Sequence, residues 1–241
     1  MELINYFLLI LVGIGAGFVQ RVSGFGLGIF VMMFLPHFMP SHTAAASISC
    51  LFSCGTSAYN AIKYRKDTDY KTVLPVLIAA LVCIPVAVYF SAKVSAAIFE
   101  ILLGAALIAL SIYFLFFNSR IQIKPTAANG VLAGALGGTL NGLFSTGGPP
   151  VVLYLTQTTK SNLTYFATIQ FYFGITNIYA VAMRALNGVI DGQVLICAAV
   201  GMVGCMTGDF LGKLVFDKLD TKKMRTIIYI GMIISGIVLF L

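Results

Sequence analysis

Charge is scarce in this sequence. Only 10% of its 241 residues are Asp, Glu, Lys or Arg, whereas 59% are hydrophobic. A soluble protein of this composition would have too few charged side chains to cover its surface, which excludes a soluble globular domain. The composition instead indicates an integral membrane protein. No polar stretch is long enough to form a soluble domain, so we expect one transmembrane domain over residues 1–241.

Motifs typical of enzymes and metal sites are also missing. The sequence contains no HExxH, no P-loop lysine and no hydrolase nucleophile motif, and its five cysteines form no CxxC pair. We therefore expect no catalytic residue, metal site or cofactor, and no use of ATP by this chain. Cys50 and Cys54 lie one helical turn apart, which leaves a membrane sulfur-transfer role as an alternative. Glu100 and Asp209 lie near the ends of expected spans, so no buried carboxylate relay is evident.

Uncharged runs of helical length follow one another along the chain. About 20 apolar residues are needed for a helix to cross a bilayer. The run 22–62 requires two segments, which Pro36 and Pro40 divide, and the run 125–159 is divided by its Gly-Pro cluster. The sequence therefore predicts an all-α polytopic membrane protein with five hydrophobic segments in each half. The remaining segments are expected at 3–20, 72–92, 101–119, 161–183, 192–208 and 226–241.

Each half contains a short motif rich in glycine and polar residues. The first is Gly15–Gly26, GAGFVQRVSGFG, and the second is Gly137–Gly148, GGTLNGLFSTGG, followed by Pro149 and Pro150. Irregular backbone at membrane depth persists only where it is buried in protein or lines a cavity. Two such breaks in corresponding positions indicate the binding site of a secondary transporter. We expect broken or re-entrant helices that meet near the bilayer midplane; whether the first two segments of each half span fully stays open.

Basic residues are unevenly distributed among the expected loops. If the loop 63–71 is cytoplasmic, alternate crossings place twelve Lys and Arg inside and two, Lys93 and Arg184, outside. Both termini are then external, and the first segment, which lacks a signal-peptide pattern, is retained. The basic excess faces anionic lipid headgroups, and no nucleic-acid partner is expected. The twelve are Lys63, Arg65, Lys66, Lys71, Arg120, Lys124, Lys160, Lys213, Lys218, Lys222, Lys223 and Arg225.

The positions of these basic residues also indicate how the two halves are oriented relative to each other. The basic loop follows the third segment in the first half but the fourth segment in the second half. The halves 1–120 and 121–241 are therefore predicted to be inverted repeats.

The two motifs have the chemistry of an anion site. A helix that begins inside the membrane presents free amide N–H groups and the positive end of its dipole. Glycine lets a ligand approach that backbone, hydroxyl and amide side chains add donors, and proline suits the first turn of the following helix. Close helix packing is the alternative explanation. The expected substrate-binding residues are Gln20, Arg21, Ser23, Gly24, Gly26, Asn141, Ser145, Thr146, Gly147, Gly148 and Pro149.

Further polar side chains on the longer segments complete the expected site. Arg21 would pair with an anion if the first segment ended near the midplane, and would be a cytoplasmic charge if that segment crossed completely. Asn60, Gln170 and Asn177 are expected to line the space between the motifs, with interhelical hydrogen bonding as the alternative. Gln170 and Asn177 are seven residues apart and share a helix face.

The paired breaks resemble those of the TauE/SafE family of sulfite and organosulfonate exporters. The second break continues as STGGPPVV over 145–152, and the resemblance extends over essentially the whole chain. It implies an inner-membrane transporter for small sulfur-containing or related organic anions. The first motif, RVSGFG over 21–26, departs from the commoner Gly-Gly-Gly form, which puts the particular substrate in doubt.

These observations favour a secondary transporter that exports a small anion across the cytoplasmic membrane. A negative cell interior favours outward movement of an anion by about 2.3 kcal/mol per charge per 100 mV, so export would need no coupling ion. A proton-coupled importer, a passive channel and the sulfur-transfer protein are the alternatives. The sequence does not define the anion or the oligomeric state.

Overall fold

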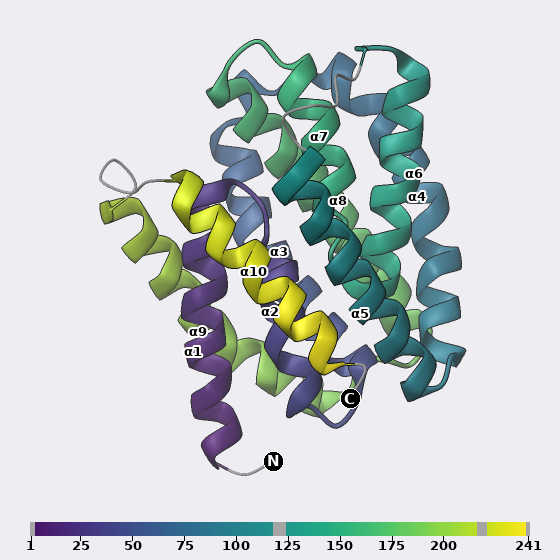
Figure 1. Cartoon of the computed structure of the whole chain (residues 1–241), viewed down its shortest axis with the longest axis vertical. Coiled ribbons are helices and arrows are strands. Elements are labelled where there is room, and N and C mark those ends of the chain that lie inside the picture. Colours follow the sequence, from purple (N-terminus) through teal and green to yellow (C-terminus); the bar gives the residue numbers. More distant parts are fainter. Residues whose placement is uncertain (1–2, 118–123, 216–220, 240–241) are drawn as a thin grey trace.

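Ten α-helices joined by short turns make up the described part of the chain (Figure 1). The computed structural model describes residues 3–117, 124–215 and 221–239, and this part contains no strand. The expected all-α fold is therefore confirmed. The helices are α1 (Leu3–Ser23), α2 (Leu27–Phe34), α3 (His42–Lys63), α4 (Tyr70–Lys93), α5 (Ala96–Ile112), α6 (Ala127–Phe144), α7 (Gly148–Thr158), α8 (Asn162–Leu186), α9 (Gly192–Val215) and α10 (Thr221–Val238).

Five of these helices are long and apolar enough to cross a membrane: α1, α4, α8, α9, and α5 with its continuation to Phe116. Their outer faces are strongly apolar. On α4, for example, Val82 and Val86 lie one turn apart and are 68% and 70% exposed. Apolar side chains exposed along spanning helices are expected to face lipid, because lipid is the solvent of such a surface. The chain is a multi-pass membrane protein.

Helix α3 is as long as the spanning helices but has a polar interior face. Ser47, Ser49, Ser53 and Ser57 are all buried there, where α3 packs against α8 and α9. The helix begins at an N-cap, Ser41, whose hydroxyl accepts the Ala44 amide N–H at 3.1 Å. This serine-rich helix supplies hydrogen-bonding groups to the interior of the bundle.

Glycines allow two pairs of helices to pack closely. On α1, a Cβ at Gly13 would lie 2.3 Å from the Gly201 carbonyl oxygen of α9, so the two backbones are in contact. On α6, a Cβ at Gly134 would lie 2.1 Å from the Val76 carbonyl oxygen of α4. Small residues produce such close crossings because no side chain separates the helices. Figure 1 accordingly shows α1 beside α9 and α4 beside α6.

Several of the main contacts of the first five helices correspond to contacts of the last five. Each helix of the first half can be matched to the helix five positions later, α1 to α6 and so on to α5 and α10. This exchange converts the α1–α9 contact into the α6–α4 contact. The same exchange converts α2–α3 into α7–α8 and α3–α9 into α8–α4, and it leaves the α3–α8 and α5–α10 contacts unchanged.

Both motifs interrupt a helix, as expected. The first break, residues 24–26, separates α1 from α2, and Gly24 and Gly26 have φ of 78° and 95°. The second break, residues 145–147, separates α6 from α7, and Ser145 has φ of 60° although it is not glycine. Because left-handed residues end a helix, α2 begins only at Leu27, after Gly24 and Gly26.

The helices after the breaks are too short to span a bilayer. At about 1.5 Å per residue, α2 is about 12 Å long and α7 about 16 Å, whereas a hydrocarbon core is about 30 Å thick. Each packs back against the helix that precedes it, α2 on α1 and α7 on α6. With about 32 Å, α1 is long enough to cross. Each half therefore begins with a longer helix followed by a half-helix.

Candidate functional site

The two breaks meet inside the bundle. A Cβ at Gly28, in the first turn of α2, would lie only 1.9 Å from the Ser145 carbonyl oxygen of the second break. A Cβ at Gly148, the first residue of α7, would lie 3.5 Å from Cδ2 of Phe25. Backbone segments from the two halves of the sequence are thus in direct contact, and α2 and α7 begin at the same place.

A small cavity lies at this meeting point, and we refer to it as the central cavity. Its volume of about 20 Å³ has room for about one water molecule and not for a multi-atom anion. The cavity is lined by Gln20, Phe25, Gly26, Leu27, Gly28, Ile29, Ser53, Asn141, Ser145, Thr146, Gly147, Gly148, Phe173 and Asn177.

Both half-helices begin at this cavity without a side-chain cap. The N-cap of α2 is Gly26 and the N-cap of α7 is Gly147, and neither helix start receives a side-chain hydrogen bond. The first N–H groups of a helix have no partner within it and carry the positive end of its dipole. The start of α2 is the richer donor, because Pro149 and Pro150 in the first turn of α7 have no N–H.

Asn141 adds a side-chain donor to the same cavity. Its side chain is 3% exposed, and its Nδ2 atom has no hydrogen-bond partner among the described residues. Leaving a buried donor unpaired costs about 1–3 kcal/mol. An oxygen acceptor that entered the central cavity would relieve this cost.

Two glutamines hold the first break in position. Gln170, fully buried on α8, donates from Nε2 to the Gly24 carbonyl oxygen at 3.1 Å. Gln20 on α1 donates to Ser57 Oγ at 3.0 Å and lies 3.4 Å from Gln170 Oε1, and its own Oε1 accepts from Thr56 at 3.0 Å. These bonds connect the break to α3 and α8. Gln170 does not line the central cavity; it holds the backbone of the first break in position.

A second polar chain fixes the other wall of the cavity. Asn177 Nδ2 donates to Ser53 Oγ at 2.9 Å, and the Cys50 thiol donates to Asn177 Oδ1 at 3.6 Å. The Ser145 hydroxyl in turn donates to Cys50 Sγ at 3.1 Å. Cys50 is therefore part of the hydrogen-bonded wall between α3, α8 and the second break.

Several expected site residues lie away from the central cavity. Arg21, Ser23 and Gly24 instead line a wider cavity of about 900 Å³, together with Lys160 and Lys213. We refer to it as the basic cavity. Among the described residues, its lining includes three cations and no Asp or Glu.

Asn60 and Pro149 line neither cavity. Asn60 donates from Nδ2 to the Thr56 carbonyl oxygen of its own helix at 3.0 Å, so this bond lies within α3 and is not the interhelical bond that was the alternative. Pro149 is buried in the first turn of α7, the position expected from its fixed φ.

The expectation that Arg184 is an external loop charge was wrong. Arg184 lies in the last turn of α8 with 0% of its surface exposed, and its Nη2 donates to the Gly142 carbonyl oxygen at 2.7 Å. The uncharged run suggested that the helix ended before Arg184, but α8 continues past it and turns this residue toward α6. Of the twelve expected cytoplasmic charges, Arg120 and Lys218 lie outside the described residues.

Sequence reasoning also missed Gly28 and Ser53, which line the central cavity. The alternation of glycine over 24–28 was a usable signal for Gly28, because three glycines at alternate positions allow close backbone approach. Ser53 lies one turn beyond Ser49 on the buried serine face of α3, and that spacing alone does not distinguish cavity lining from packing.

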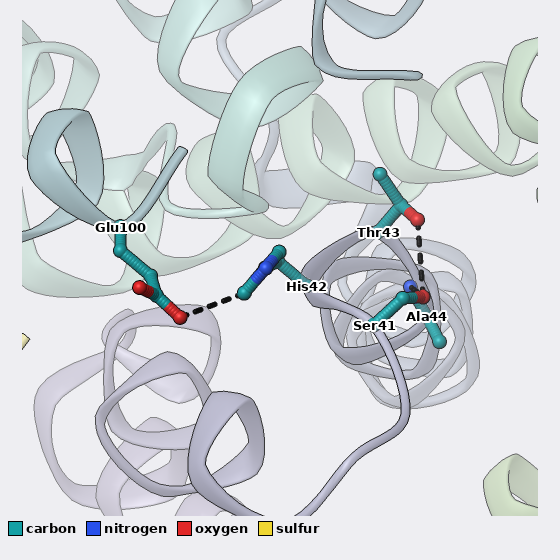
Figure 2. A network of polar contacts seen from close by, with 5 residues as sticks. All are labelled: Ser41, His42, Thr43, Ala44 and Glu100. Atoms are coloured by element: carbon teal, nitrogen blue, oxygen red, sulfur yellow. Dashed lines mark hydrogen bonds and ion pairs between the residues drawn. The ribbon is translucent and has the colours of Figure 1, made fainter. Parts of the chain in front are cut away.

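One carboxylate, Glu100, lies near the start of α3 (Figure 2). Its Oε1 is 3.7 Å from Nδ1 of His42, and Glu100 is 40% exposed. The His42 ring stacks on Phe99 with centroids 5.1 Å apart, and Phe99 meets Phe144 edge to face at 5.1 Å. This aromatic contact reaches the residue that precedes the second break.

A multi-pass helical membrane protein whose two broken helices begin at one interior polar cavity has the architecture of a secondary transporter. The chain belongs to the sulfite exporter TauE/SafE family, whose sequence model matches residues 9–239. The resemblance seen in the paired breaks is thereby confirmed, and the chain is a membrane transporter rather than an enzyme.

A curated relative supports the same assignment. The chain is 25% identical over 228 residues to the probable sulfite/organosulfonate exporter TauE of Cupriavidus necator, covering 90% of this chain and 88% of that protein. No solved structure matches this chain significantly.

Proposed function

We propose that this protein exports small sulfur-containing or organic oxyanions, such as sulfite or sulfonates, across the cytoplasmic membrane. One observation carries the proposal: the uncapped starts of α2 and α7 and the unpartnered amide of Asn141 converge on one cavity. These groups are donors, and the described lining of the cavity contains no carboxylate that would repel an anion. Helix starts of this kind bind anions through backbone N–H groups.

The basic cavity provides the entrance in this proposal. Arg21, Lys160 and Lys213 raise the local concentration of anions through their combined field. The basic cavity reaches the first break at Gly24, and the central cavity begins at Gly26. On the predicted topology the basic cavity opens to the cytoplasm, which is the side from which an exported anion enters.

The proposed topology has two inverted repeats and two external termini. It is supported by the contact pattern that survives exchange of α1–α5 for α6–α10. It is also supported by Figure 1, in which α1 begins and α10 ends toward the same side of the molecule. Because the central cavity is too small for an anion, transport requires the two halves to separate around the breaks.

Cysteine labelling in intact cells tests this topology. Single cysteines replace Lys66, Lys160 and Asn187, all of which are exposed turn residues, in a protein whose own cysteines are replaced by alanine. We expect a membrane-impermeant maleimide to label the cysteine at 187 in intact cells, and those at 66 and 160 only after permeabilisation. Labelling at 66 or 160 in intact cells would contradict the topology.

Transport by purified protein in liposomes tests the function. We expect saturable fluxes of sulfite and isethionate, driven by membrane potential without a proton gradient. Arg21→Gln should raise KM about three- to tenfold at low ionic strength, and Arg21→Lys should restore it in part, because charges at a cavity mouth steer anions. The difference should shrink in 0.5 M salt through screening.

Lys93→Gln is the matched control, because Lys93 is exposed at the end of α4 and lines neither cavity. Each alternative gives a different result. A flux that does not saturate would indicate a channel, and uptake that requires a proton gradient would indicate a proton-coupled importer. Full transport by the cysteine-free protein would exclude a sulfur-transfer role for Cys50 or Cys54.

A further inference from the structure

Arg184 is a buried cation that lines neither the central cavity nor the basic cavity. It is fully buried, and of its donor atoms Nη2 alone has a described hydrogen bond, to the Gly142 carbonyl oxygen at 2.7 Å. Its Nε and Nη1 atoms have no hydrogen-bond partner within the described ranges. Arginine remains charged in proteins and carries five N–H donors, so most of its hydrogen-bonding capacity is unfilled.

No acidic side chain in the described ranges compensates this charge. The described part of the chain contains one side-chain ion pair, between His42 and Glu100, and it does not include Arg184. The polar side chain beside the guanidinium is Cys50, and a thiol is only a weak acceptor. A buried charge without a partner strongly disfavours the folded state unless something else compensates it. Within a membrane protein, such a residue is a candidate for a functional role.

Arg184 lies on α8, the helix that also lines both the basic cavity and the central cavity. The first residues of α8, including Tyr165 and Phe166, line the basic cavity, and Phe173 and Asn177 further along line the central cavity. Arg184 follows Asn177 by seven residues, which places it on the same helix face, beyond the central cavity.

Cys50 interacts with both Arg184 and a residue that lines the central cavity. Cys50 lies beside the guanidinium and also accepts the Ser145 hydroxyl, and Ser145 lines the cavity. The cavity must enlarge to hold an anion, because its volume is about 20 Å³. Movement of Cys50 away from Ser145 would enlarge it toward the unfilled N–H groups of Arg184.

We propose that Arg184 is the charged ligand of the transported oxyanion when the central cavity opens toward Cys50. This inference rests on the proposed function and names the cation of the same site. The planar guanidinium can donate two parallel hydrogen bonds to a carboxylate, sulfonate or sulfite group. Backbone N–H groups of α2 and the Asn141 amide then bind the remaining oxygens, and the substrate supplies the negative charge that the fold lacks.

Binding of sulfite and isethionate to the purified full-length protein tests this proposal. We expect Arg184→Met to raise the Kd of both anions at least tenfold, and Arg184→Lys to give an intermediate Kd, because an ammonium keeps the charge but not the planar fork. Lys93→Gln is the control and should keep the wild-type Kd. Thermal unfolding without anion is the second measurement: Arg184→Met should be at least as stable as the wild type, because it removes an uncompensated buried charge.

The outcomes separate the two proposals. An Arg184→Met protein that binds both anions with wild-type Kd overturns the role of Arg184, as does loss of folding of the anion-free protein in both the Met and the Lys variants. Either result would make Arg184 a structural residue that holds α6 through Gly142. If the wild-type protein itself binds neither anion, the proposed function fails first, and the role of Arg184 fails with it.

Discussion

Replacing Gly28 with alanine is expected to abolish transport and to destabilise the protein by about 3 kcal/mol or more. The added Cβ would lie 1.9 Å from the Ser145 carbonyl oxygen, and the obstacle is backbone rather than a flexible side chain. Overpacking in a close-packed interior typically costs about 1–3 kcal/mol, and here relief requires the two breaks to move apart. Thermal unfolding in detergent and flux in liposomes measure the two effects.

Gly192→Ala is the matched control for this substitution. Gly192 begins α9, and no atom lies within 4 Å of the position of an added Cβ. We expect its stability to stay within about 0.5 kcal/mol of the wild type. Normal transport by Gly28→Ala would show that the breaks do not need to touch during the transport cycle.

Gly147→Val is a poor test of ligand binding, although Gly147 is among the expected substrate-binding residues. A Cβ at Gly147 would lie 2.2 Å from the Gly137 carbonyl oxygen of α6. The substitution would therefore disrupt the packing of α6 against α7, whatever its effect on an anion. At Gly24 the added Cβ would meet Tyr165 at an ordinary 3.5 Å, but the φ of 78° would be strained for valine.

Gln170→Leu is expected to destabilise the protein by about 2–4 kcal/mol and to lower the transport rate at least tenfold. The substitution keeps the approximate size of the side chain but removes the donor to the Gly24 carbonyl oxygen and the acceptor beside Gln20. Each buried polar group left unpaired costs about 1–3 kcal/mol. The first break would lose its tie to α8, and with it the orientation of the α2 N–H groups toward the central cavity.

Gln193→Leu makes the same chemical change outside both cavities. Gln193 lies in the first turn of α9 and donates to the Tyr6 hydroxyl at 3.1 Å. We expect a small loss of stability, about 1 kcal/mol, and normal KM for sulfite. If Gln170→Leu also kept the wild-type KM and rate, the first break would not depend on α8 for its geometry.

The helical segments and both breaks were predictable because their signals are local. Uncharged runs with lengths near that of a bilayer crossing become helices, as α4 illustrates over Tyr70–Lys93. Glycine adopts the positive φ that ends a helix, so the break after α1 follows from Gly24 and Gly26 themselves, and the break after α6 lies in the second glycine-rich motif. The half-helix character of α2 and α7 was left open, because a run of apolar residues does not reveal how many of them enter a helix.

The roles of two arginines depended on partners that are distant in the sequence. Arg21 faces the basic cavity because α1 packs on α9 and brings it near Lys213. Arg184 is buried because α8 lies against α6, where the Gly142 carbonyl oxygen accepts its N–H group. Charge counting placed Arg184 in a loop and left the role of Arg21 open, since it considers position along the chain and not the face of a helix.

The sequence by itself determined that this is a helical membrane protein with one glycine-rich break in each half, because composition and backbone preference act within a few residues. Only the tertiary structure decided that the breaks touch at Gly28 and Ser145. It also decided that Asn141 and Arg184 retain unfilled hydrogen-bond donors in the interior. Such properties depend on which backbone atoms lie opposite one another, and helix packing across the whole bundle sets that arrangement.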